Sequence, residues 1–138
     1  MCRPESVLVI VHTPLRECLL LERVNPVGFW QSVTGTLHWD ETPVQTAARE
    51  VVEETGIVTD GLVDAEIQRR FPILPEWRDR YTPDVTENLE HLWYLPVDDV
   101  VPVTLNADEH SAFRWLALEE AIETVSSWTN REALERLR

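Results

Sequence analysis

The segment from Gly35 to Ile57 places the strongest constraint on how this chain folds. Its sequence, GTLHWDETPVQTAAREVVEETGI, predicts a loop that opens at a glycine, followed by a helix that ends at Gly56. Because an α-helix turns about 100° per residue, Glu50, Glu53 and Glu54 share roughly one third of its circumference. We expect the core to cover the opposite, apolar side of the helix, formed by Val44, Ala47, Ala48, Val51 and Val52.

Three carboxylates on one helix face repel one another, which costs stability unless a cation lies among them. Arg49 lies one turn before Glu53 and can neutralise only part of this charge. A divalent metal is the simplest source of the missing charge, and oxygen ligands suit Mg²⁺ or Mn²⁺. A solvated acidic face is the alternative, and the carboxylates alone do not decide between the two interpretations.

The complete spacing of this segment favours the metal interpretation. Gly35, Glu41 and the run Arg49-Glu50-Val51-x-Glu53-Glu54-x-Gly56-Ile57 match every fixed position of the Nudix box. The chain therefore resembles the Nudix hydrolases, which cleave nucleoside diphosphates linked to another moiety. The resemblance implies an α/β fold, an α/β/α sandwich with a mixed β-sheet. It also implies one Nudix domain over residues 1–138, with its box at 35–57.

The resemblance assigns roles to individual residues, position by position. The implied metal ligands are Gly35, Glu50, Glu54 and Glu109. The implied catalytic residues are Arg49, Glu53 and Glu109, and either of the two glutamates could be the base. The implied substrate contacts are Arg23, Thr34, Phe71, Leu74 and Ser127. We expect hydrolysis of a phosphoanhydride assisted by Mg²⁺, with Mn²⁺ as the alternative ion.

Stretches outside the box narrow the expected substrate. FWQSVTG at 29–35, RDRYTPDVTEN at 78–88 and SWTNR at 127–131 resemble bacterial members that remove pyrophosphate from 7,8-dihydroneopterin triphosphate in folate biosynthesis. Those members also act on dATP and other nucleoside triphosphates. A general or sanitising nucleoside triphosphate pyrophosphohydrolase is the alternative enzyme. A non-catalytic nucleotide-binding module is disfavoured, because this chain keeps every glutamate of the box.

Composition excludes several other functions. The net charge of −13 argues against nucleic acid as the main partner, because its phosphates would be repelled. All twelve basic residues are arginine, which excludes a Schiff-base lysine and a P-loop lysine. Cys2 and Cys18 could form a disulfide, although a reduced protein is the simpler interpretation. With no signal pattern and no apolar run of ~20 residues, we expect a cytoplasmic monomer or small homo-oligomer without membrane contact.

The rest of the chain predicts a sheet with helices on both faces. At 138 residues the length suits one domain with its own core. Hydrophobic patterning predicts strands at 6–12, 18–22, 29–33, 62–71, 89–95 and 112–116. Amphipathic helices are predicted at 118–125 and 129–137, the second capped by Thr129 or Asn130. We expect a long surface loop at 72–88, and we expect Trp30 and Trp128 to be core aromatics.

Overall fold

A seven-stranded sheet forms the centre of the computed structural model, which describes all residues from Met1 to Arg138. The strands are β1 Glu5–His12, β2 Glu17–Arg23, β3 Trp30–Gln31, β4 Val33–Thr36, β5 Val63–Pro72, β6 Glu87–Pro96 and β7 His110–Ala117. The helices are α1 Pro43–Thr55, η1 Pro75–Arg80, α2 Leu118–Thr124 and α3 Trp128–Glu135, of which η1 is a 3₁₀-helix.

The sheet is mixed, as predicted. Strand β1 runs parallel to β6 and antiparallel to β2 and β4. Strand β5 pairs antiparallel with β6, and β7 pairs antiparallel with β2. The apolar run of β1 is buried because strands flank it on both sides and helices cover both of its faces.

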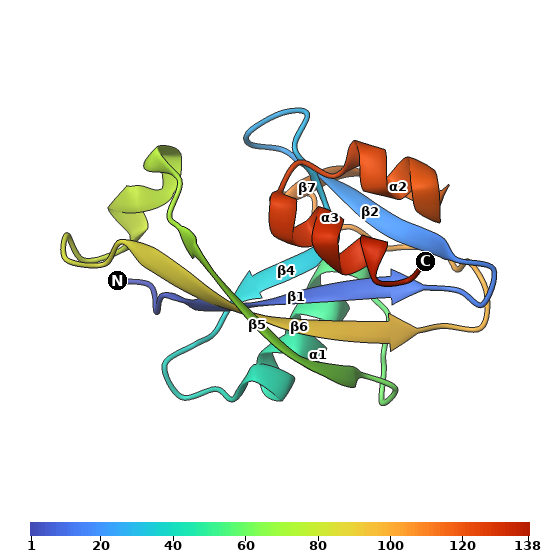
Figure 1. Cartoon of the computed structure of the whole chain (residues 1–138), viewed down its shortest axis with the longest axis horizontal. Helices are drawn as coiled ribbons and strands as arrows, with labels where there is room; N and C mark the ends of the chain where they lie inside the picture. Colours follow the sequence, from blue (N-terminus) through green and yellow to red (C-terminus); the bar gives the residue numbers. More distant parts are fainter.

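Helix α1 lies on one side of the sheet, and α2 and α3 lie on the other (Figure 1). Alternate residues of β1 point to the two faces, so the strand contributes to both cores. Val7 and Val9 pack with Ala47 and Val51 of α1. Leu8 and Ile10 pack with residues of α2 and α3 on the opposite side. The predicted α/β/α sandwich is confirmed. None of the helices has the length and apolar composition needed to span a membrane.

The orientation of α1 differs from the prediction. Ala47 and Val51 are buried, but Val44 is 47% exposed and Val52 is 45% exposed. Glu50 and Glu54 are buried instead, with exposures of 8% and 1%. The helix therefore turns its two glutamates toward the protein interior, beside Ala47 and Val51. The prediction that the core covers the side opposite the glutamates is therefore wrong for Val44 and Val52, because α1 packs with Glu50 and Glu54 turned inward.

Three local predictions also need correction. The predicted strand at 29–33 is divided at Ser32, whose N–H donates to the Asn130 side chain at 2.8 Å instead of continuing a ladder. The predicted loop at 72–88 contains η1 and the ends of two strands. Trp128 is half exposed and is not a core aromatic, whereas Trp30 packs against the α2 and α3 core.

The cap of α3 was also predicted wrongly. Ser127 is the N-cap, and its hydroxyl accepts a hydrogen bond from the Asn130 N–H at 3.2 Å. Thr129 and Asn130 were the predicted caps, but both lie inside the first turn and are buried. The Asn130 side chain is used elsewhere, because its amide binds both the N–H and the hydroxyl of Ser32. This pair of bonds fixes the start of α3 against the β3–β4 junction.

Candidate active site

The ends of α1 are fixed by local sequence. Thr42 caps the helix by accepting the Gln45 N–H, and the Gln45 side chain accepts the Thr42 N–H in return. Gly56 ends the helix at φ 77°, a left-handed conformation that favours glycine, and its N–H binds the Val52 carbonyl. These caps fix the register in which the helix presents its carboxylates.

Arg49 connects the acidic side chains of the box. Its guanidinium donates to Glu41 at 2.7 and 2.9 Å, to Glu50 at 2.7 Å and to Glu53 at 3.1 Å. It also donates to the Thr36 carbonyl on β4 at 3.1 Å. The hydrogen bonds from Arg49 lower the pKa of Glu41 to about 2. Arg49 therefore ties the loop, the helix and the strand together and neutralises part of the carboxylate charge.

Gly35 makes room for one of the glutamates. A Cβ atom at this position would overlap the Cγ and Cδ atoms of Glu50, so any larger residue would displace the Glu50 side chain from its present position. The backbone conformation at Gly35 is ordinary, and close approach alone explains the residue. The structure thus places Gly35 against Glu50, within the set of residues that sequence analysis assigned to the metal.

Glu50, Glu54 and Glu109 come together at one point. Oxygen atoms from these three carboxylates lie within 4.8 Å of one another. Glu109 is distant in sequence and reaches the cluster through the turn before β7, where its N–H binds the Asn106 carbonyl at 3.0 Å. Its own carbonyl accepts the Val24 N–H at 2.9 Å, which holds this turn against the end of β2.

The electrostatics of this cluster suit a divalent cation. Burial, together with the hydrogen bond and charge of Glu50 and the charge of Glu109, raises the pKa of Glu54 well above its usual range. Burial also raises the pKa of Glu50. Oε1 of Glu54 is buried and has no hydrogen-bond partner. A buried carboxylate oxygen without a partner is costly, and three converging carboxylates are oxygen ligands of the kind that hard divalent cations take.

His110 and Gln31 lie beside Glu54, and neither was a predicted site residue. Nε2 of His110 is 3.9 Å from Oε1 of Glu54 and 3.1 Å from the Gln31 amide nitrogen. Burial, and then the charge of Arg23, lowers the pKa of His110 to about 4, so the imidazole is neutral at pH 7. Neither residue has a motif of its own. Their positions follow only from the pairing of β3 and β7 with β2.

The remaining predicted site residues lie outside the triad. Glu53 is half exposed and turned toward Arg49, outside the triad of Glu50, Glu54 and Glu109. Thr34 lies on β4, next to Gly35, and its backbone contributes a hydrogen bond that opposes part of the Glu54 pKa shift. Arg23 ends β2, directly opposite His110 in the β2–β7 ladder. Thus Glu53 contacts Arg49, Thr34 adjoins Gly35, and Arg23 pairs with His110.

Phe71 and Leu74 lie on the segment that leads from β5 into η1, and Leu74 is the residue before that helix. Ser127 has a structural use as the α3 cap. Its neighbour Ser126 binds both the N–H and the carbonyl of Trp30, which brings the 126–127 turn beside β3. The structure therefore gives Ser127 a second, structural explanation beside the substrate contact that was predicted.

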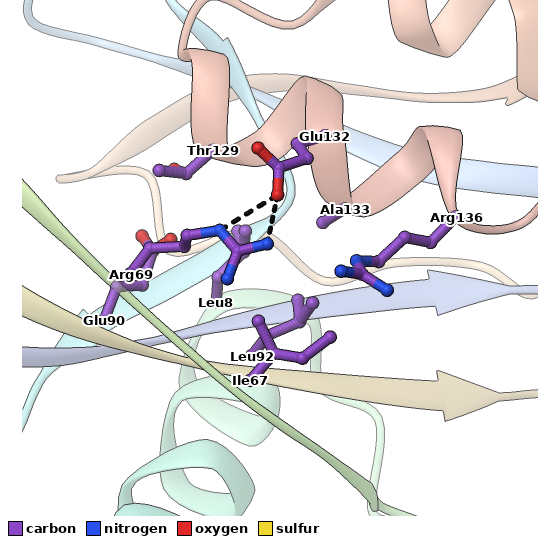
Figure 2. A pocket seen from close by; sticks show the side chains of 9 residues that line it. All are labelled: Leu8, Ile67, Arg69, Glu90, Leu92, Thr129, Glu132, Ala133 and Arg136. Carbon is purple, nitrogen blue, oxygen red and sulfur yellow. Dashed lines mark hydrogen bonds and ion pairs between the residues drawn. The ribbon is translucent and has the colours of Figure 1, made fainter.

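A separate hollow lies on the other face of the sheet, under α3 (Figure 2). Leu8, Ile67, Leu92 and Ala133 supply its apolar lining, and Arg69 extends across it to pair with Glu132. It contains none of the three carboxylates of the triad. The triad on α1 and before β7 is therefore the candidate active site.

Comparison with known proteins agrees with this geometry. The NUDIX domain family model matches residues 3–137, and this chain belongs to the Nudix family of hydrolases. Members of this family use divalent metal ions, which agrees with the acidic triad.

Individual relatives are similar over nearly the whole chain. The chain is 39% identical to the dihydroneopterin triphosphate diphosphatase of Escherichia coli (strain K12), over 97% of this chain and 91% of the relative. It is 36% identical to the protein of the same name from Haemophilus influenzae, over 96% of this chain and 85% of the relative. The solved E. coli dihydroneopterin triphosphate pyrophosphohydrolase superposes with a TM-score of 0.91 at 36% identity, covering 98% of this chain and 94% of that chain.

Proposed function

We propose that this chain is a pyrophosphohydrolase that converts 7,8-dihydroneopterin triphosphate to the monophosphate and pyrophosphate, and that it also acts on dATP and other nucleoside triphosphates. The observation that carries the proposal is the convergence of Glu50, Glu54 and Glu109 within 4.8 Å. The extended similarity to proteins named for this activity supports the choice of substrate. We further propose that residues 1–138 act as a single domain.

We assign Mg²⁺ binding to Glu50, Glu54 and Glu109, with Gly35 providing the space that Glu50 needs. Bound there, the ion would neutralise phosphate oxygens and lower the pKa of a water molecule. Glu50 offers two oxygens, of which Oε1 is held by Arg49 at 2.7 Å. Arg49 is therefore a positioning residue, because it orients a ligand without entering the triad itself.

Two carboxylates are candidates to accept the proton from the attacking water. Glu53 is turned toward Arg49 at 3.1 Å and lies outside the triad. Glu109 is exposed and has a carboxylate oxygen within the triad. We assign the proton transfer to Glu109, because a general base must lie within hydrogen-bond reach of the reacting water. Thr34, beside Gly35 on β4, is available to donate its hydroxyl to a phosphate oxygen.

The direct test is a side-by-side turnover assay with 7,8-dihydroneopterin triphosphate, dATP and 8-oxo-dGTP in the presence of Mg²⁺. We expect the pterin triphosphate to have the highest kcat/KM, and phosphorus NMR to show pyrophosphate as the first phosphate product. Much faster turnover of 8-oxo-dGTP would replace the proposal with a sanitising enzyme. Orthophosphate as the first product would show that a different bond is cleaved.

A further inference from the structure

Two arginines and two aromatic rings meet between the β2–β3 loop and η1. The Trp77 ring on η1 lies edge to face with Phe29, with the ring centroids 5.9 Å apart and an interplanar angle of 68°. The guanidinium carbons of Arg23 and Arg80 lie 5.3 and 5.9 Å from the centroid of the same Trp77 ring. One indole thus holds two cations from separate elements, at distances where the ring attracts them.

Neither of these guanidiniums has a carboxylate partner. Arg23 donates only to the Asn25 carbonyl at 3.0 Å, and the Arg80 side chain has no hydrogen bond or ion pair within the chain. By contrast, Arg49 and Arg69 are both paired with glutamates. Burial, and then the nearby charge of Arg80, lowers the pKa of Arg23, as expected for two cations on one ring. The charges of Glu54 and Glu109 act in the opposite direction on Arg23, but neither carboxylate forms an ion pair with it. Two adjacent guanidiniums without a direct carboxylate partner keep their donors available for an anion.

The arginine pair adjoins the acidic triad. Arg23 pairs with His110 in the β2–β7 ladder. His110 directly follows Glu109, the metal-binding candidate. Val24, which follows Arg23, donates its N–H to the Glu109 carbonyl at 2.9 Å. An anion that is bound to a cation at the triad and extends toward the end of β2 therefore meets Arg23 first and Arg80 beyond it.

We propose that Trp77 gathers Arg23 and Arg80 into one anion-binding site, which takes the outer phosphates of the triphosphate substrate. The inference rests on the proposed function and deepens it. Arg80 is a substrate-binding residue in this arrangement, and it supplies the forked donors that suit phosphate oxygens. Trp77 is a positioning residue, because it acts by holding the two guanidiniums near each other.

The proposal is tested with a ligand that has phosphates but no aromatic ring. Methylenediphosphonate is a diphosphate analogue that cannot be hydrolysed, and its binding in saturating Mg²⁺ is measured by calorimetry. We expect Arg80→Gln to raise its Kd by about tenfold, the loss typical of one charge-assisted contact. Arg78→Gln is the matched control, since Arg78 lies on the same short helix and reaches only the Pro83 carbonyl at 3.5 Å. Its Kd should change less than about twofold.

Two results would overturn the site. The first is a Kd for Arg80→Gln equal to that of the unsubstituted protein. The second is an equal loss in Arg78→Gln, which would show only a general effect of charge. Arg80 is exposed, so thermal melting of the Gln variant should match that of the unsubstituted protein. In turnover assays, the same variant should raise KM with little change in kcat, because an outer phosphate contact binds substrate and transition state alike.

Trp77 is tested by its coupling to Arg80. Trp77→Ala should weaken methylenediphosphonate binding several-fold, and the double variant with Arg80→Gln should lose less than the product of the two single losses. Trp77→Phe keeps an aromatic face and should restore most of the affinity, which also guards against misfolding of the Ala variant. If Trp77→Ala binds the diphosphonate normally and loses only the pterin substrate, Trp77 stacks on the substrate ring and the proposed role is wrong.

Failure of this inference can be told from failure of the proposed function. Efficient release of pyrophosphate by an Arg80→Gln variant with unchanged KM would remove the arginine site and leave the activity standing. Diphosphonate binding that depends on Arg80, in a protein that hydrolyses no triphosphate, would keep the site and remove the activity.

Discussion

Glu54 and Glu90 are both buried glutamates, but they lie on opposite faces of the sheet and have different neighbours. Glu54 is 1% exposed on the α1 side, where Glu50 and Glu109 converge on it. Glu90 is 7% exposed on the α3 side, near Thr129 (Figure 2). The nearby Arg69 pairs with Glu132 and not with Glu90. Burial raises the pKa of both carboxyl groups. The comparison teaches that burial of one acid does not define a site, whereas convergence of several acids does.

The largest expected effect is on catalysis at Glu54. Glu54→Gln keeps the size of the side chain and removes its charge, so kcat should fall by at least about a thousandfold through loss of a metal ligand. Glu90→Gln provides the comparison, and its kcat should stay within about twofold of the unsubstituted value. Steady-state assays with saturating Mg²⁺ measure both. Comparable losses in the two variants would break the distinction between the two faces.

Glu109 carries the next largest effect. Glu109→Gln should lower kcat by at least about a hundredfold, the size expected for losing a general base or a metal ligand. Asp108→Asn is the matched control, because Asp108 is adjacent but lies outside the triad. Thermal melting should be unchanged in both variants, since both residues are exposed in a turn. Normal turnover by Glu109→Gln would remove this residue from the site.

Glu90 should affect stability rather than activity. Burial raises its pKa from 4.5 to about 7 in the folded protein, so stability is highest below pH 4.5 and falls as pH rises through 7. At pH 8 this effect lowers the free energy of unfolding by about 3 kcal/mol. Urea unfolding of Glu90→Gln should therefore show a gain over the unsubstituted protein that grows from pH 5 to pH 8. Glu87→Gln, an exposed site on the same strand, should show no such gain.

The smallest expected effect is on thermal stability when Mg²⁺ is added, and it should depend on Glu54 but not on Glu90. Mg²⁺ at about a hundredfold excess over its Kd should raise Tm by several degrees at pH 8. The rise should be smaller at pH 5, because the raised pKa of Glu54 lets protons compete with the ion as pH falls. Glu54→Gln should lose most of the rise, and Glu90→Gln should keep it. A rise independent of pH and of Glu54 would place the ion elsewhere, as would full activity in excess EDTA.

The sequence predicted much of the triad because box spacing is a local property. Caps at Thr42 and Gly56 fix the helix, and the helix fixes the directions of Glu50 and Glu54. Resemblance added Glu109, which no local pattern could place. The mixed sheet also followed from strand patterning and the resemblance together.

Other features depend on contacts between distant segments, which no local pattern contains. The burial of Glu50 and the exposure of Val52 follow from the approach of α1 to Gly35. The position of His110 beside Glu54 follows from strand pairing. The arginine pair on Trp77 requires η1 and the β2–β3 loop to meet. Ser127 caps α3 in place of the predicted Asn130, because the Asn130 side chain binds Ser32 instead.

The hydrogen bonds of Arg49 have a consequence for the entropy of the acidic side chains. One guanidinium restrains Glu41, Glu50 and Glu53 and is anchored to the Thr36 carbonyl. Because it holds one oxygen of Glu50, the folded protein has already restricted the rotation of that side chain. A cation that binds at the triad would therefore need to order less of Glu50 than of a freely rotating glutamate, so less of the binding free energy is lost as side-chain entropy.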